Sequence, residues 1–294
     1  MCGIIAYTGK QDAIKILSNG LKQLEYRGYD SSGIALQDSK DSIYINKVVG
    51  SVSKLITKSK MLQFNSMCGI GHTRWATHGS AILKNAHPIQ SESKKITVVH
   101  NGIIENYSEL KSNLLKKGVR FRTDTDTEVL ANLIDSFNNS KISLEKALSK
   151  AIKMTVGAYT IALITNEEPG KIVFARTGYA GGIVIAKNSD STLIASDIAA
   201  IKNNNYSITF LEAGEMGIAN KNNVSFFNLQ GKKIQKKFEK FSQSESINEK
   251  GKYQYFLEKE IFEQPDSMFD FIRDTYQQKK NDIHFDDFKL THKE

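Results

Sequence analysis

The chain has 294 residues, of which 40% are hydrophobic and 24% charged, and its formal net charge is +8. This composition is typical of a folded globular protein and excludes a disordered chain, and no apolar run reaches the ~18–20 residues of a membrane span. Two cysteines are too few for a disulfide scaffold and no secretory leader is visible, so we expect a cytoplasmic protein without a membrane partner.

The positive charge does not by itself indicate a nucleic-acid partner. The lysines lie among asparagines, as in KNNNYS and GKKIQKKFEKF, and are not interleaved with aromatic residues on one predicted face. We therefore expect a solvated basic surface and no nucleic-acid binding. A basic nucleic-acid binder stays as an alternative, which steeply salt-dependent binding would reveal.

Strand-like and helix-like segments alternate at the start of the chain. GIIAYTG (3–9) is a short apolar run that reads as a buried strand, and Asp12 then opens a helix with an apolar face. MCGIGHTRWATHG (67–79) starts as a strand and passes into a polar loop. Further strands are predicted at 32–37, 42–50 and 95–102.

The middle of the chain is predicted to hold helices and then many strands. Helices are predicted at 104–117, 125–138 and 143–153, the second with a capping box between Thr125 and Glu128. From Gly157 to Leu229, short apolar or alternating runs recur between glycine, asparagine and aspartate. This pattern is typical of antiparallel strands.

The end of the chain changes in character. We predict one domain over 2–238, a polar linker over 239–252 and a helical stub over 253–294. The stub carries an apolar stripe on both sides of Pro265. Because it is too short for a typical separate domain, we expect residues 253–276 to self-associate or to bind a partner.

Cys2 is the first candidate for chemistry. Removal of Met1 would leave Cys2 at the N-terminus, where a free α-amino group with a pKa of about 7.7–8.0 can act as a general base. One residue would then hold the nucleophile and the base together. The alternative is that Cys2 is only a small residue at the start of a strand.

Cys68 occurs in the same four letters, MCGI, but has no α-amine of its own. It lies in a predicted strand, and free cysteines are often buried, so we expect a core thiol. A Cys–His nucleophile stays open, since His72 and His78 are close in sequence. The histidines show no metal-ligand spacing, and there is no P-loop or dinucleotide fingerprint, so no metal or cofactor is expected.

The string HTRWATHG (72–79) offers groups for a substrate. Arg74 suits a carboxylate, because its fork of donors can bind both oxygens. Trp75, Thr77 and His78 lie beside it. The alternative for Arg74 is an ordinary surface ion pair.

Two other strings add an oxyanion site and a carboxylate. HNGIIEN (100–106) places the Asn101 amide next to the unhindered backbone N–H of Gly102, which together form a workable oxyanion hole for acyl transfer. Asp126, in TDTDTE (123–128), can hold an ammonium group. A turn residue and a helix start are the structural alternatives for Asn101 and Asp126.

These strings occur together in the order and spacing of a known family. The chain resembles the glutaminase half of glutamine–fructose-6-phosphate aminotransferase, within the family of glutamine amidotransferases that use an N-terminal nucleophile. Amidophosphoribosyltransferase is the nearest rival, which HTRWATHG and KEIFEQP disfavour. The resemblance rests on MCGI (1–4), LEYRGYDSSG (24–33), GHTRWATHG (71–79), NAHP (85–88), VVHNGIIENY (99–107), TDTEVLA (125–131), LIASD (193–197), LEAGE (211–215) and KEIFEQP (259–265).

The resemblance implies an α+β fold, a four-layer αββα sandwich of the N-terminal-nucleophile hydrolase type. It also implies that Cys2 attacks the side-chain amide of L-glutamine and forms a glutamyl thioester, with Asn101 and Gly102 stabilising the oxyanion. The ammonia would serve an aminotransferase reaction in amino sugar biosynthesis.

The same resemblance assigns the substrate-binding groups. Arg74, with Thr77 and His78, would bind the glutamine carboxylate, and Asp126 the α-ammonium. Two more residues follow from it: Trp75 would shield the site and gate the path of ammonia, and Arg27 would support the closed site.

The chain departs from the family pattern at two places. RTGYAGGIVI (176–185) replaces the usual Ser-Pro-Leu turn, so an edge of the glutamine pocket at 178–182 is expected to differ. The chain also stops at Glu294, before any sugar-isomerase half, so we expect that half to lie on a separate chain or to have been lost from a fragment. The alternative function is an inactive or regulatory remnant that binds a partner isomerase.

Overall fold

The structure is a computed structural model, and it divides the chain into two units, Met1–Glu245 and Ser246–Glu294. The division falls inside the segment predicted as a linker. Most of that linker and parts of the predicted stub, together with Ala180 of the unusual turn, lie outside the described residues. The described residues are 2–38, 40, 42–59, 65–138, 142–179, 181–201, 205–221, 223–241, 252–253, 256–277 and 282–283.

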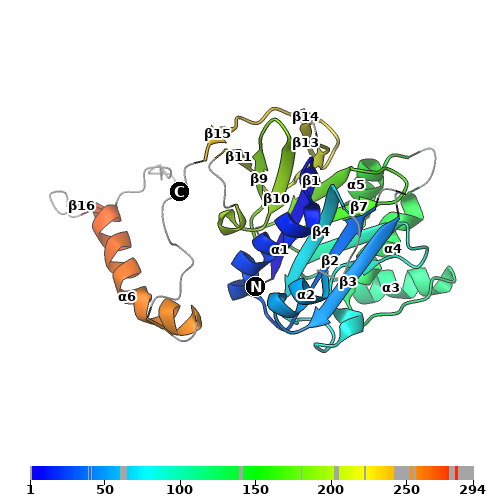
Figure 1. Ribbon diagram of the computed structural model, residues 1–294, viewed down its shortest axis with the longest axis horizontal. Helices are drawn as coiled ribbons and strands as arrows, with labels where there is room; N and C mark the ends of the chain where they lie inside the picture. Colours follow the sequence, from blue (N-terminus) through cyan, green and yellow to red (C-terminus); the bar gives the residue numbers. More distant parts are fainter. Residues whose placement is uncertain are drawn as a thin grey trace. The chain divides into compact units, whose positions relative to one another are not determined.

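Two antiparallel sheets form the frame of the larger unit (Figure 1). The first contains β1 (Gly3–Gly9), β2 (Ser31–Gln37), β3 (Ile43–Val49), β4 (Cys68–Arg74), β9 (Val184–Lys187), β10 (Ser191–Ala195), β11 (Ser207–Phe210) and β15 (Glu239–Lys240). The second contains β5 (Ile89–Gln90), β6 (Ile96–Gly102), β7 (Tyr159–Thr165), β8 (Ile172–Thr177), β12 (Glu215–Ala219), β13 (Val224–Asn228) and β14 (Lys233–Ile234). Their strand orders are β15-β11-β9-β10-β1-β4-β2-β3 and β14-β13-β12-β8-β7-β6-β5.

Helices cover the outer face of each sheet (Figure 1). The first sheet is covered by α1 (Ala13–Leu24) and α2 (Val52–Ser59). The second is covered by α3 (Tyr107–Lys116), α4 (Asp126–Phe137) and α5 (Leu144–Met154). The order helix, sheet, sheet, helix confirms the predicted four-layer αββα sandwich.

The packing of β1 explains why this strand consists of seven mostly apolar or small residues. Ile4 and Ala6 lie in the core between the two sheets, whereas Ile5 and Tyr7 lie in the core under α1. All four side chains are completely buried. Because successive residues of a strand face opposite sides, both sides of this central strand must be apolar.

The antiparallel strands predicted between Gly157 and Leu229 are present, but they do not form one sheet. β7, β8, β12 and β13 belong to the second sheet, whereas β9, β10 and β11 belong to the first. Residues 239–240, predicted as linker, pair with β11 as β15. Local patterns give strand positions but not the sheet that a strand joins.

Two predicted helix starts have different outcomes. Asp12 caps α1 as expected, its Oδ1 accepting from the backbone N–H of Ile14 at 3.1 Å. The capping box of α4 is wrong, because the Thr125 side chain makes no cap hydrogen bond. Glu128 reaches past Thr125 to the backbone N–H groups of Arg122 and Thr123, at 2.9 and 2.6 Å, since the preceding loop folds over the first turn.

The smaller unit contains α6 (Phe256–Thr275) and the short pair β16 (Tyr276–Gln277) and β17 (Asp282–Ile283). The helix continues through Pro265, where the sequence predicted helix on both sides. No helix among the described residues is long and apolar enough to cross a membrane.

Phe174 and Gly217 make the first test of this packing. They face each other on β8 and β12, and a Cβ on Gly217 would lie 2.2 Å from the Phe174 ring. Gly217→Ala should therefore lower the free energy of unfolding by about 1–3 kcal/mol through overpacking. Urea unfolding measures the effect, and Gly217→Ala should matter little in a Phe174→Leu background, where the ring is gone. An equal loss in both backgrounds would contradict the contact.

Candidate active site

A cavity of about 550 Å³ is lined by all nine residues that the sequence analysis assigned to the site. Its wall includes the predicted residues Cys2, Arg27, Arg74, Trp75, Thr77, His78, Asn101, Gly102 and Asp126. It also includes His87, His100, Ile103, Thr125, Thr127, Tyr179, Gly181 and Ser196, which were not predicted as site residues. Segments from both sheets and from the loops at one end of them meet there.

Strand pairing carries the start of the chain to this cavity. Gly3 lies opposite Thr73, so Cys2 falls beside the end of β4. The backbone N–H of Trp75 donates to Cys2 Sγ at 3.2 Å, and the thiol donates to Trp75 O at 3.4 Å. On the other side, Ser196 Oγ accepts from the backbone N–H of Ile4 at 2.9 Å.

The two thiols have different surroundings. Cys2 is partly exposed in the cavity, and burial raises the pKa of its thiol while the Trp75 hydrogen bond opposes this rise. Cys68 is 3% exposed in the core between the sheets, and burial raises the pKa of its thiol to about 12. Cys68 thus occupies the core position expected of it, and it does not line the cavity.

Asn101 and Gly102 lie at the end of β6, on the other sheet. Asn101 Nδ2 donates to the backbone carbonyl of Cys2 at 2.9 Å, so the predicted oxyanion donor touches the predicted nucleophilic residue. Gly102 has φ +124°, and a Cβ there would lie 2.5 Å from Ala158 O. Only glycine suits this backbone, which leaves the position next to Asn101 without a side chain.

Arg74 shapes the loop that follows it. Its Nη2 donates to the carbonyls of His78 and Gly79 at 2.5 and 2.8 Å, and its Nη1 donates to Ser80 O at 3.2 Å. The guanidinium is almost completely buried and lies in the cavity wall. The surface ion pair considered for Arg74 is therefore wrong, because carbonyls surround a buried side chain.

Asp30 holds the same loop from another direction. Its carboxylate accepts from the backbone N–H of Ala76, and its own N–H donates to Arg74 O at 3.1 Å. The sequence contains Asp30 in the string YRGYD, where no role was assigned. Trp75, 48% exposed, meets Tyr29 edge to face with centroids 5.5 Å apart.

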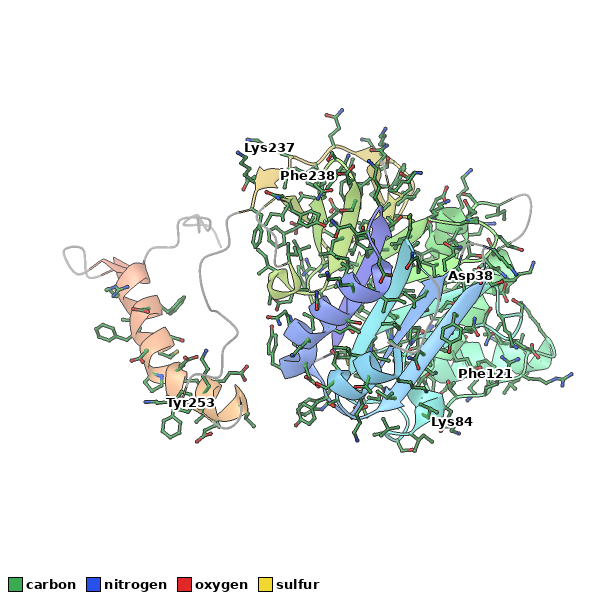
Figure 2. The ribbon with its side chains drawn as sticks, in the orientation of Figure 1. Asp38, Lys84, Phe121, Lys237, Phe238 and Tyr253 are labelled. Carbon is green, nitrogen blue, oxygen red and sulfur yellow. The ribbon has the colours of Figure 1, made fainter. Side chains whose placement is uncertain are left out.

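Asp126 is the first residue of α4, and its side chain is buried. Asp126 Oδ2 accepts from the backbone N–H of Ile104 at 2.9 Å. The loop before it is fixed by Lys84, labelled in Figure 2, whose Nζ lies 2.9 Å from Asp124 Oδ2. Asp126 lies in the cavity wall, so its carboxylate is a candidate partner for a cationic group of a ligand.

Arg27 is anchored by a carboxylate to which no role was predicted from the sequence. Its Nη1 contacts Asp197 Oδ2, and Tyr26 OH donates to the same oxygen at 2.6 Å. Burial and this carboxylate raise the pKa of Tyr26 to about 12. The string LIASD thus supplies the residue that fixes Arg27 at the cavity.

The unusual turn after β8 lies at the cavity, as expected of an altered pocket edge. Tyr179 and Gly181 are in its wall, and Tyr179 is 91% exposed. Gly178 and Gly181 have φ +58° and +67°, which favours glycine at both positions. Tyr179 was visible in the sequence as the bulkiest residue of that turn.

Three buried histidines lie together at the cavity, with His87 and His100 in its wall, and no sequence pattern predicted this grouping. His72, His87 and His100 are each at most 5% exposed, and burial lowers the pKa of all three. Among the described residues, no three histidine, cysteine or acidic side chains are placed to hold a metal ion. These imidazoles contact oxygens of Asn101 and Thr127 instead.

Comparison with known proteins shows what the chain is similar to. The family model described as "Glutamine amidotransferase domain" matches residues 72–203. Glutamine–fructose-6-phosphate aminotransferase (isomerizing) of Chlorobaculum tepidum is 41% identical over 289 residues, which are 97% of this chain and 46% of that protein. The same enzyme of Clostridium acetobutylicum is 40% identical over 99% of this chain and 47% of its own length. The chain spans about half the length of the curated relatives it matches.

A solved structure supports the fold. The glutamine phosphoribosylpyrophosphate amidotransferase from B. subtilis, complexed with ADP and GMP, has a TM-score of 0.68 and 25% identity, covering 78% of this chain and 49% of that one. The αββα sandwich is the fold of amidotransferases of the N-terminal-nucleophile hydrolase class, and Cys2 lines its cavity. Residues 72–203 thus form a glutamine amidotransferase domain.

The two cysteines should differ in reactivity. Iodoacetamide should alkylate Cys2 in the folded protein and leave Cys68 unmodified, because Cys68 is buried and its pKa is about 12. Since the pKa of Cys2 is also raised, its alkylation should accelerate as the pH rises above neutral. Peptide mass spectrometry measures both sites, with the unfolded protein as the control in which both react. Equal labelling in the folded state would contradict the assignment.

Proposed function

We propose that this chain hydrolyses L-glutamine to glutamate and ammonia through a thioester on Cys2, after removal of Met1. One observation carries the proposal: a cysteine thiol, an amide donor and a buried carboxylate line the same cavity in a chain with a glutamine amidotransferase domain. Each group has the chemistry that one part of glutamine requires.

The thiol begins the reaction. Cys2 Sγ forms a bond to the side-chain carbonyl carbon of glutamine, and the free α-amine takes the thiol proton, directly or through a water. The same amine then returns that proton to the leaving nitrogen, and ammonia departs as the C–N bond breaks. A water molecule cleaves the resulting thioester, which yields glutamate and regenerates the thiol.

The oxyanion of each tetrahedral intermediate requires donors in place beforehand. An amide NH2 group has two hydrogens, and one of those of Asn101 is used by Cys2 O. The other, with the backbone N–H of Gly102, serves the oxyanion. Removal of such a donor slows acyl-transfer enzymes by about 10²–10³ in kcat.

The remaining groups bind the amino-acid end of the substrate. Asp126 is proposed to hold the α-ammonium, since its carboxylate lies in the cavity wall, where it accepts one backbone N–H. Arg74, Thr77 and His78 are proposed to bind the α-carboxylate, with Arg74 acting also through the loop carbonyls it holds. Trp75 is proposed to shield the thioester and gate ammonia, and Arg27 to support the closed site.

The fate of the ammonia is proposed from the relatives. Those relatives are named glutamine–fructose-6-phosphate aminotransferases, and this chain spans about half their length. We propose that the ammonia serves glucosamine-6-phosphate synthesis, with an isomerase half beyond the 294 residues or on another chain. The self-association or partner binding of 253–276 and the cytoplasmic location stay predictions, the latter supported by two unpaired cysteines.

Cys2→Ala and Asp126→Asn separate the nucleophile from substrate binding. Cys2→Ala should reduce glutamate release to background, because no thioester can form. Asp126→Asn keeps an oxygen for the Ile104 N–H but loses the charge, so KM should rise about 10–100-fold with a smaller effect on kcat. A coupled glutamate assay over a range of glutamine concentrations measures both.

The same assays distinguish the glutaminase from the alternative function, a regulatory remnant. Unchanged glutamine hydrolysis by Cys2→Ala would sink the mechanism. An inactive wild-type chain that captures a sugar-phosphate isomerase would establish the regulatory remnant instead. Fructose 6-phosphate should not stimulate this chain, since the sugar half of its relatives lies outside it.

A further inference from the structure

The Asn101 amide has two ends of opposite polarity and nearly the same shape, and only one of them can stabilise an oxyanion. In the structure, Nδ2 faces Cys2 and donates to its carbonyl at 2.9 Å. A half-turn about the last side-chain bond would place Oδ1 there, against another oxygen. The site therefore needs a group that selects one orientation.

His72 is placed to make that selection. Its Nε2 lies 3.0 Å from Asn101 Oδ1 and 3.1 Å from the backbone carbonyl of His100. Both of these oxygens accept hydrogen bonds only, so Nε2 must carry the hydrogen. A flipped Asn101 would point its NH2 group at this N–H, donor against donor, and would lose its bond to Cys2 O as well.

The His72 ring stays neutral because it is completely buried, and the two acceptor oxygens at Nε2 set its tautomer. Burial lowers its pKa to about 3, so the ring is neutral at any pH at which the protein works. The Nε2–H that faces Asn101 thus keeps its hydrogen across the physiological pH range.

A second histidine fixes the plane of the ring. His87 stacks on His72 with ring centroids 4.2 Å apart and an interplanar angle of 27°. The backbone around His87 is pinned by Lys47, whose Nζ donates to Ala86 O and Pro88 O at 2.6 and 3.3 Å. With His87 packed against one face, rotation of His72 would require this segment to move.

We propose that His72 is a positioning residue for the oxyanion donor: its Nε2–H selects the orientation of the Asn101 amide, and the His87 ring holds His72 in the plane that this requires. The inference rests on the proposed glutaminase function, in which Asn101 serves the oxyanion. His72 lies on β4 of the first sheet, whereas Asn101 lies on the second, and His72 does not line the cavity proposed to bind the substrate.

His72→Leu tests the role, and His72→Gln provides the matched rescue. Leu removes the donor, so kcat for glutamine hydrolysis should fall by about 10–100-fold with KM nearly unchanged, somewhat less than the loss of the oxyanion donor itself. Gln places an amide N–H near the position of Nε2 and should recover most of kcat. Alkylation of Cys2 by iodoacetamide forms no oxyanion, so its rate should be the same in all three proteins.

Asn46→Leu controls for the loss of a buried polar group. Asn46 is 2% exposed on β3 of the same sheet, where it donates to Ser59 Oγ at 2.9 Å and is absent from the cavity wall. It should lower stability without lowering kcat. The proposal is overturned by wild-type kcat in His72→Leu, by His72→Gln as slow as His72→Leu, or by an equal fall in Asn46→Leu.

Nitrogen-15 NMR of the imidazoles distinguishes a failure of this inference from a failure of the proposed function. The neutral Nε2–H tautomer of His72 should persist between about pH 5 and 8, and the Asn101 side-chain amide signal should shift in His72→Leu. These signals need no turnover. If the wild-type protein shows these NMR signals but does not hydrolyse glutamine, the proposed glutaminase function is wrong and the contact between His72 and Asn101 stands. If an active protein shows the Nδ1–H tautomer of His72, the positioning role alone is wrong.

Discussion

One side-chain amide joins the two sheets at the cavity. Asn101 belongs to β6 of the second sheet. It accepts from His72 on β4 of the first sheet and donates to Cys2, which directly precedes β1 of that sheet. The predicted nucleophile and the predicted oxyanion donor therefore come from different sheets. Their distance is set by how the sheets stack, so the apolar core between the sheets is also a determinant of the site.

Polar groups are buried beside this apolar core, and such burial is costly unless each group finds a hydrogen-bond partner. An unpaired amide or imidazole in an apolar interior loses its bonds to water, a loss of about 1–3 kcal/mol for each group. His72 and Asn101 avoid much of this loss by bonding to each other and to backbone carbonyls. The arrangement is stable only while both sheets keep their register, which couples packing to the geometry of the site.

Sequence reasoning predicted the parts of this structure that depend on local pattern. The buried strand at 3–9, the Asp12 cap and the antiparallel runs after Gly157 follow from side-chain periodicity and turn residues. The strings around Cys2, Arg74, Asn101 and Asp126 identified groups that the structure brings into one cavity. The chemistry of a short sequence motif can therefore be predicted without a structure.

Relations across the fold could not be read in this way. No local sequence pattern predicts that β9 joins the first sheet and β8 the second. Glu128 bonds upstream of the predicted cap because its loop folds back. His72 was visible in HTRWATHG, yet its partner lies on the other sheet. Asp30 and Asp197 were also visible, but their contacts with the Arg74 loop and Arg27 exist only in three dimensions.

Cys2 is proposed to work as a chain terminus, with its own amine as the base. The most direct test compares glutamine hydrolysis with intact mass in samples that retain or have lost Met1, prepared by treating one batch with methionine aminopeptidase for increasing times. The rate should rise in proportion to the fraction lacking Met1, and the Met1-bearing chain should be inactive. Equal turnover by the chain that keeps Met1 would contradict this role of Cys2.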